Sequence, residues 1–243
     1  MKPISMLWKL SLLLTVWVVG VLTGCVEKVV GSGTVKSETR QVEAFHGVEV
    51  RGPLEALVSQ DPTATVKIEA DDNLVPLITT QVQDGTLIVD ITASRVSSKN
   101  PLKIEIAAPE LDHLNLGGPG TLVGVGEIHS TSMSLRCGGS GKLSVSGEFE
   151  TVESDFGGSG EMVLKGTAGE ASYRVGGSGT LDASELQVAG PYGVQLAGSG
   201  TVAVWADGPL DVTLAGSGSV TYKGNTEKPN TTITGTGAVT RVP

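Results

Sequence analysis

The residues whose pattern is most similar to a known metal-binding motif lie in seven glycine-rich turns between positions 117 and 237. Six of these turns read Gly-Gly-x-Gly or Ala-Gly-x-Gly, and the seventh reads Thr-Gly-Thr-Gly. Calcium-binding β-rolls use Gly-Gly-x-Gly-x-Asp, in which the aspartate is a ligand. In this chain the place of that aspartate is always apolar, being Leu122, Leu143, Met162, Leu181, Val202, Val220 or Val239. Apolar side chains cannot bind a hard cation, so we expect no calcium site in these turns.

Histidine offers no clearer metal site. The chain has three histidines, namely His46, His113 and His129. They lie far apart in the sequence and show none of the short spacings typical of zinc ligands. We therefore expect no metal and no cofactor.

Charged residues occupy the place two positions before the turn in three successive repeats. Asp155 stands there between Arg136 and Arg174 of the neighbouring repeats. Such a pattern is typical of a charge ladder on a solvated face, because a polysaccharide-active enzyme would need its carboxylates gathered in one groove. We expect no catalytic residues, and we regard these three side chains as candidate contacts for a partner. Trp205, the only tryptophan after residue 24, is the fourth candidate, since an exposed tryptophan can stack on a sugar or anchor a protein.

The elements that carry these residues follow from the spacing of the turns. The last glycines are at positions 120, 141, 160, 179, 200, 218 and 237, so the period is 18–21 residues. A period near twenty indicates a stacked solenoid. The residue before each turn is apolar in all seven copies, and the one before that is polar in all seven. This alternation predicts strands with one buried face.

Each repeat therefore reads as a strand, a tight glycine turn, a second strand and a looser turn. Glycine is needed where the backbone has a positive φ or where stacked turns come too close for a Cβ atom. We predict an all-β solenoid with two main sheets, built from repeats of about 19 residues and roughly 34 Å long at a spacing of about 4.8 Å per coil.

The first residues resemble a bacterial lipoprotein signal peptide. Lys2 and Lys9 precede an apolar run from position 10 to 21, and Leu-Thr-Gly-Cys ends at Cys25. A run of this length is too short to span a membrane and fits a cleaved signal. The resemblance implies removal of residues 1–24 and acylation of Cys25. Val26 follows where the inner-membrane retention signal has Asp, so the resemblance favours the outer membrane of a Gram-negative cell.

Between the lipid site and the repeats we predict two regions. Residues 25–40 form the lipidated cysteine and a spacer, and residues 41–116 form strands that make the first coils and cap the repeats at 117–243. One short helix is expected over residues 73–83, with Asp71 or Asp72 as its cap and Pro76 in its first turn. Together with Glu69, these aspartates form a cluster that could also hold a cation.

Charge and cysteine content exclude further classes. Without residues 1–24 the chain has 15 Lys plus Arg against 26 Asp plus Glu, a net charge of −11. Nucleic acid is excluded as a partner, and attachment to a membrane must come from the acyl chains. Cys137 is the only thiol left, so no internal disulfide forms. It occupies an apolar position of the repeat and reads as a core residue.

Several segments together resemble the putative auto-transporter adhesin, head GIN domain family of bacterial exported proteins. They are the Gly-Ser-Gly turns, Phe45-His-Gly-Val-Glu-Val50, Val66-Lys-Ile-Glu-Ala-Asp-Asp-Asn-Leu74, Asp84-Gly-Thr-Leu-Ile-Val89 and Pro109-Glu-Leu111. The resemblance covers roughly residues 40–240. It implies a right-handed β-helix similar in outline to pectin lyases, without their catalytic residues, and a role in adhesion.

Three functions stay open. The first is a non-catalytic envelope lipoprotein that binds a glycan or a surface protein. The second is a structural module that forms homo-oligomers, because the open end of a coil stack is a template for strand addition. The third is a polysaccharide-active enzyme, which the scattered carboxylates disfavour.

Overall fold

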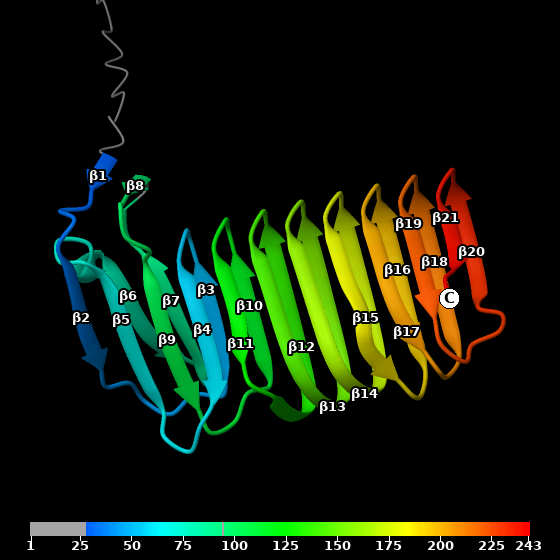
Figure 1. The fold of residues 1–243 in the computed structure, drawn as a ribbon, viewed down its shortest axis with the longest axis horizontal. Helices are drawn as coiled ribbons and strands as arrows, with labels where there is room; N and C mark the ends of the chain where they lie inside the picture. Colours follow the sequence, from blue (N-terminus) through cyan, green and yellow to red (C-terminus); the bar gives the residue numbers. More distant parts are fainter. Residues whose placement is uncertain (1–27, 94) are drawn as a thin grey trace, which may run out of the picture.

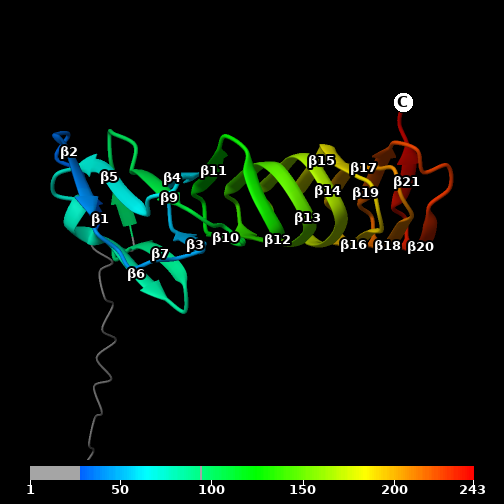
Figure 2. The ribbon, with the colours of Figure 1, turned by 90° about the horizontal axis from the view of Figure 1, so that it is seen from below.

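Seven successive coils form the body of the protein, and each contains one of the seven glycine turns (Figure 1). The computed structural model describes residues 28–93 and 95–243, so the predicted signal peptide and Cys25 lie outside the described residues. Hydrogen bonds join nineteen strands into one sheet that winds into a β-solenoid, as the period predicted (Figure 2). No helix in the described part of the chain has the length and apolarity needed to cross a membrane.

Strands before the glycine turns form one face of the solenoid, which we call face 1. They are β10 (His113–Gly117), β12 (Ile128–Gly139), the second halves of β13 (Lys142–Gly158) and β14 (Glu161–Gly177), β16 (Tyr192–Gly198), β18 (Leu210–Gly216) and β20 (Asn230–Gly235). Strands after the turns form face 2. They are β11 (Thr121–Val125), the first halves of β13 and β14, β15 (Thr180–Val188), β17 (Thr201–Ala206), β19 (Ser219–Lys223) and β21 (Ala238–Arg241). Each of these strands pairs in parallel with the corresponding strand of the next coil.

The glycine turns stack on one another, and glycine is needed there for both of the expected reasons. The second residue of every turn has a positive φ, for example 112° at Gly177. The fourth residue lies so close to the coil below that a Cβ at Gly160 would sit 2.2 Å from the carbonyl oxygen of Gly141. The first residue is unrestricted, since a Cβ at Gly176 would meet nothing within 4 Å. Alanine or threonine can therefore replace glycine at the first place alone.

The predicted inward positions form the core. The residues before the turns are at most 2% exposed in six coils, namely Leu116, Cys137, Phe156, Val175, Leu196 and Leu214. Ile233 in the last coil is 45% exposed because none of the described strands packs beyond that end. Burial raises the pKa of the Cys137 thiol, which agrees with its interpretation as a core residue.

Two buried tyrosines allow a direct test of this core. Tyr173 and Tyr192 come from adjacent coils, and their rings meet edge to face with centroids 5.2 Å apart. The two hydroxyls lie close enough to influence each other, but neither forms a hydrogen bond of good geometry with a described residue. We expect Tyr173→Phe to raise the free energy of unfolding by about 1 kcal/mol, since an enclosed unpaired hydroxyl is costly. Urea unfolding measures this change. Tyr222→Phe is the control, because the Tyr222 hydroxyl is not enclosed in this way, and an equal effect of both changes would contradict the explanation.

The amino-terminal region does not stack in the order of the sequence. β3 (Gly47–Arg51) pairs with β10 on one side and with β7 (Thr86–Ile91) on the other. β4 (Glu55–Gln60) likewise lies between β11 and β9 (Lys103–Ala108). The coil formed by β7 and β9 is thus farther from the repeats than the coil formed by β3 and β4, although β7 and β9 come later in the chain. Antiparallel β6 (Ile78–Gln83) borders face 1 at this end, and β5 (Thr65–Asp71) and β2 (Val35–Arg40) border face 2. β1 (Lys28–Val30) and β8 (Arg95–Ser97) form a separate small sheet.

The prediction of a helix over residues 73–83 is wrong. A 3-10 turn, η1 (Val75–Leu77), occupies its start, and the remainder is β6. Residues 78–83 are rich in β-branched side chains that favour a strand. Asp84 and Gly85 then have φ angles of 48° and 75°, which suit the tight turn of a β-hairpin with β7.

The two aspartates expected to cap that helix instead fix neighbouring loops. Buried Asp71 accepts hydrogen bonds from Asn100 Nδ2 at 2.6 Å and Ser98 Oγ at 2.7 Å. These two bonds hold the pKa of Asp71 below its ordinary value. Asp72 accepts a bond from Ser32 Oγ at 2.5 Å. Hydrogen bonding to the loops therefore accounts for both side chains.

Candidate functional site

The charged ladder lies on face 1 in the expected order. The parallel register places Asp155 directly between Arg136 and Arg174, and all three side chains are exposed. The ion pairs within 4.0 Å in the described part of the chain do not include Asp155 with either arginine. Neither arginine takes part in any of these ion pairs.

Trp205 lies on the other face. It belongs to β17 on face 2, is partly exposed, and has the ammonium of Lys223 4.5 Å from its ring centroid. That distance is typical of a cation–π contact, which holds the ring against the surface. The structure thus does not bring Trp205 together with Arg136, Asp155 and Arg174.

A cluster that the sequence did not reveal lies where face 1 meets the amino-terminal region. His46 Nδ1 lies 2.8 Å from Asp112 Oδ2, and His113 Nδ1 lies 2.5 Å from Asp112 Oδ1. The two imidazole rings stand edge to face, with centroids 5.6 Å apart. His113 Nε2 is 2.8 Å from the hydroxyl of Thr86. One carboxylate therefore joins two imidazoles, and a hydroxyl orients the second.

Three chain segments build this cluster. His46 precedes β3, Thr86 begins β7, and His113 begins β10 after Asp112. The register pairs Gly47 with both Thr86 and His113, which brings the starts of the three strands side by side. The backbone N–H of His46 also donates to Gly85 O at 2.9 Å, and that of Asp112 donates to His46 O at 2.9 Å. Main-chain bonds therefore position the cluster independently of its side chains.

Glycines make room for the imidazole rings. A Cβ on Gly47 would lie 1.8 Å from the His113 ring, and a Cβ on Gly85 would lie 2.2 Å from His46 Nε2. Both glycines thus have a packing role beside the cluster.

The charge of Asp112 is stabilised at this position. Burial raises the pKa of this carboxyl, but hydrogen bonds from His46 and His113 outweigh it and hold the pKa below the ordinary value. The site therefore presents an ionised carboxylate between the two histidine rings.

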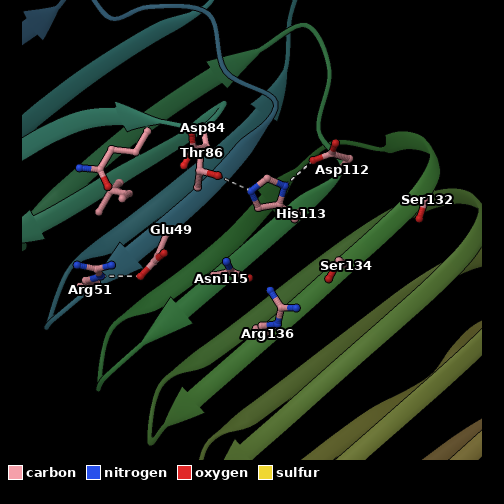
Figure 3. Close-up of a pocket in the computed structure, with 12 residues that line it drawn as sticks. Glu49, Arg51, Asp84, Thr86, Asp112, His113, Asn115, Ser132, Ser134 and Arg136 are labelled. Atoms are coloured by element: carbon pink, nitrogen blue, oxygen red, sulfur yellow. Dashed lines mark hydrogen bonds and ion pairs between the residues drawn. The ribbon is translucent and has the colours of Figure 1, made fainter.

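A groove of about 650 Å³ opens beside the cluster (Figure 3). Its floor is the outer face of β3, β10 and β12, and its wall is the turn between β6 and β7. The lining is almost entirely polar and consists of Glu49, Arg51, Gln83, Asp84, Thr86, Ile88, Asp112, His113, Asn115, Ser132, Ser134 and Arg136. A second groove, of about 480 Å³, shares Asp112 and Ser132 with it and includes His46 and His129. The cluster lies between two polar grooves.

Sequence reasoning missed this cluster because 67 positions separate His46 from His113. The signal was available in the repeat itself. His113 lies three positions before Leu116, and Gly47 lies three positions before Val50. Aligning the segment before β3 with the repeats would have placed both histidines at one corner of neighbouring coils.

Comparison with known proteins agrees with the fold. The family model described as putative auto-transporter adhesin, head GIN domain, matches residues 44–226. A comparison with curated proteins finds no significant match.

Solved structures from Bacteroides and Parabacteroides species have the same fold. A putative adhesin from Bacteroides fragilis superposes with a TM-score of 0.80 at 22% identity, covering 88% of this chain and all of that one. A putative lipid binding protein from Parabacteroides distasonis gives 0.71 at 23% identity, covering 89% of this chain and all of that one. A putative adhesin from Parabacteroides merdae gives 0.69 at 20% identity, with 89% and 99% covered. Likeness at this identity establishes the fold.

Proposed function

Because the chain belongs to the putative auto-transporter adhesin, head GIN domain family, we propose that it is a non-catalytic binding module of the cell envelope. We place its binding surface on face 1, over the groove beside His113 and the ladder from Arg136 to Arg174. Adhesion through a hydrophilic polymer such as a glycan is the function that this surface supports best.

The polar groove is the observation that carries the proposal. Only Ile88 among its lining residues is a large aliphatic, so the surface offers hydrogen bonds and charges in place of an apolar pocket. Hydroxyl groups of a sugar suit such a lining. Exposed Arg136, Asp155 and Arg174 extend this polar surface along the axis on which the coils stack. An extended ligand could follow it over several coils.

Glycan binding by the full chain in mild detergent tests the proposal. The chain is applied to an array of glycans and envelope polymers, together with Arg136→Ala and Trp205→Ala. We expect Arg136→Ala to weaken binding and Trp205→Ala, on the opposite face, to leave it unchanged. The reverse pattern would assign binding to face 2. No binding by a chain whose circular dichroism shows the folded state would contradict the proposal and favour a structural role.

We also propose that acyl chains on Cys25 attach the module to the envelope, in the outer membrane if the cell is Gram-negative. The support is Leu22-Thr-Gly-Cys25 after a short apolar run. We expect Cys25→Ser to abolish incorporation of an alkyne-labelled fatty acid and to release the chain from the membrane fraction. Cys137→Ser is the matched control, because that thiol is buried. Equal labelling of the Cys25→Ser chain would show that the anchor is elsewhere.

A structural module is the second candidate, and the open carboxyl-terminal coil favours it. Every residue of β20 is exposed, and β20 and β21 each pair with a strand on one side within the described residues. Unpaired strand edges can add strands of a second copy. Light scattering over a wide concentration range tests this, because a monomer throughout would exclude self-assembly through that end.

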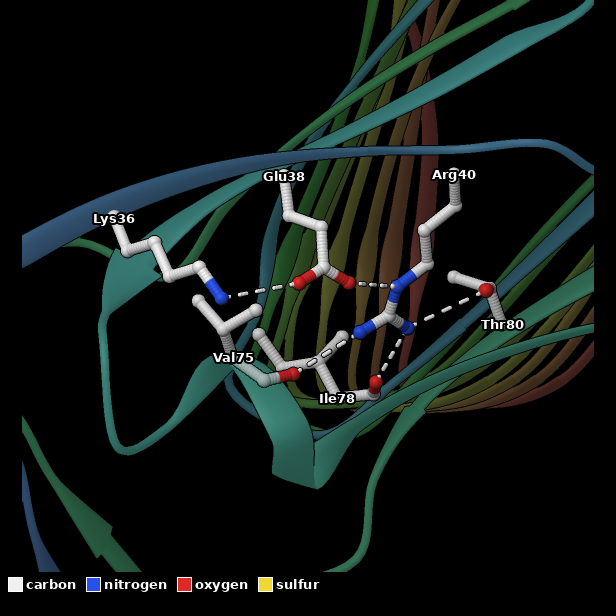
Figure 4. A network of polar contacts seen from close by, with 6 residues as sticks. All are labelled: Lys36, Glu38, Arg40, Val75, Ile78 and Thr80. Carbon is white, nitrogen blue, oxygen red and sulfur yellow. Dashed lines mark hydrogen bonds and ion pairs between the residues drawn. The ribbon is translucent and has the colours of Figure 1, made fainter.

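At the amino-terminal end, β2 and β6 likewise each pair with one strand within the described residues, but a side chain bridges the two edges. Arg40 of β2 donates to Ile78 O at 2.5 Å and to Val75 O at 3.1 Å, and its Nε lies 2.9 Å from Glu38 (Figure 4). This one guanidinium thus ties the last strand of face 2 to the turn before β6. Lys36 also reaches Glu38, at 3.4 Å, but contacts nothing else in this network.

We expect Arg40→Ala to lower the free energy of unfolding by about 2 kcal/mol, since hydrogen bonds from a charged group are worth about 1.5–3 kcal/mol. Lys36→Ala should change it by less than about 0.5 kcal/mol, as exposed ion pairs do. Urea unfolding compares the two variants. Equal values would mean that the backbone bonds of Arg40 do not hold the cap.

A further inference from the structure

The cluster of His46, Asp112 and His113 has the composition of a transition-metal site. One nitrogen from each histidine and one carboxylate oxygen lie within 4.8 Å of one another. Two imidazole nitrogens and a carboxylate oxygen are a common three-ligand set for zinc. Ligand atoms of a tetrahedral zinc site are about 3.4 Å apart, given metal–ligand distances near 2.1 Å. The observed contacts to Asp112, at 2.8 Å and 2.5 Å, are hydrogen-bond distances, so each nitrogen must move about 0.6–0.9 Å from the carboxylate oxygen to reach that separation.

The surroundings hold the rings as a metal site would require. Ligating histidines generally donate their other ring N–H to a nearby oxygen, which fixes the tautomer. Thr86 Oγ1 lies 2.8 Å from His113 Nε2, so it can accept the Nε2–H of the tautomer in which Nδ1 gives up its bond to Asp112 and binds a cation. Gly47 and Gly85 seat the two rings, because a Cβ at either position would overlap an imidazole. Main-chain bonds between the three segments complete the support.

The position of the cluster also leaves coordination places open. His46 and Asp112 are each 48% exposed and His113 is 21% exposed. Asp112 lines both grooves, whereas His113 lines one and His46 the other. A cation held by these three atoms would be accessible from solvent. Calcium and magnesium prefer sites made of oxygen ligands alone, so the two imidazoles select against them.

We propose that His46 Nδ1, His113 Nδ1 and the Asp112 carboxylate bind a divalent transition-metal ion of the zinc class. This inference goes beyond the proposed binding of a glycan and does not depend on it. The bound ion joins the segments before β3 and β10 and leaves at least one coordination place for water or a ligand. Without the metal, the same side chains form the hydrogen-bonded cluster described above.

Zinc titration of the untagged full chain tests the proposal. The chain is purified in mild detergent, stripped with a chelator and titrated with Zn²⁺ in a calorimeter. We expect one ion per chain, and we expect His46→Ala or His113→Ala to weaken binding by about 100-fold or more, because loss of an outer partner alone costs about 10–100-fold. Thr86→Val removes such an outer partner and should weaken binding about 10-fold. Mg²⁺ and Ca²⁺ should give no heat of binding.

His129→Ala is the matched control. His129 is the third histidine, its side chain is 60% exposed, and it lies 3.4 Å from Glu148, outside the cluster. We expect this variant to bind zinc as the unaltered chain does and to show the same rise in melting temperature on adding zinc. Circular dichroism confirms that each variant is folded. Absence of zinc binding, or equal affinity in His46→Ala, His113→Ala and His129→Ala, would overturn the proposal.

Discussion

Gly177→Ala is expected to lower the free energy of unfolding by about 3–4 kcal/mol. A residue other than glycine pays about 1–2 kcal/mol for a left-handed backbone, and Gly177 has a φ of 112°. Its added Cβ would also lie 2.4 Å from the carbonyl oxygen of Gly158 in the preceding coil. That oxygen belongs to the stacked backbone and cannot move without disturbing the neighbouring coil. Urea unfolding followed by circular dichroism measures the loss.

Gly176→Ala is the matched control, one residue away in the same turn. A Cβ there meets nothing within 4 Å, and the register pairs Gly176 with Ala197 of the next coil. The chain itself thus carries alanine at this place, and we expect a change below about 0.5 kcal/mol. If the two alanine variants unfolded alike, stacking of the turns could not be the reason for the glycine.

Phe156→Ala is expected to cost about 3–5 kcal/mol, the range for removing a buried aromatic ring. Phe156 is fully buried and lies in register between Cys137 and Val175. Its ring fills the space below the next turn, where a Cβ on Gly179 would come 2.4 Å from Phe156 Cζ.

Phe156→Leu distinguishes a cavity from a general loss of hydrophobicity. Leucine occupies the same place in other coils, at positions 116, 196 and 214. We expect this change to cost about 1–2 kcal/mol, since leucine refills most of the space. Calorimetric melting of both variants provides the comparison. A leucine variant as unstable as the alanine variant would show that the shape of the ring, and not the volume it fills, matters here.

The repeats were predictable because their signals are local. The period of the turns predicted the coils, and the alternation of apolar and polar residues before Leu116 and after Gly120 predicted the inward positions. These positions are buried in all but the uncovered last coil. The parallel register followed as well, so Arg136, Asp155 and Arg174 are neighbours as expected. Each of these features depends on residues a few positions apart.

The amino-terminal region was less predictable because its contacts are distant. Residues 73–83 contain a proline and follow two aspartates, a pattern that fits the start of a helix. Residues 78–83 nevertheless form a strand, because β6 pairs with β7. The insertion of the β3–β4 coil between the repeats and the β7–β9 coil is also invisible in the sequence. Pairing energies between separate segments outweigh local propensity there.

The sequence by itself determined the solenoid, its inward and outward faces and the need for glycine at the turns, because a fixed period repeats the same local requirement in every coil. Only the tertiary structure decided that His46, Asp112 and His113 meet and that Trp205 lies on the opposite face from the arginine ladder. Parallel stacking of β3 on β10 pairs residues 66 positions apart, which brings His46 beside His113. Such proximity depends on which strands pair, and in the amino-terminal region no local pattern specifies that choice.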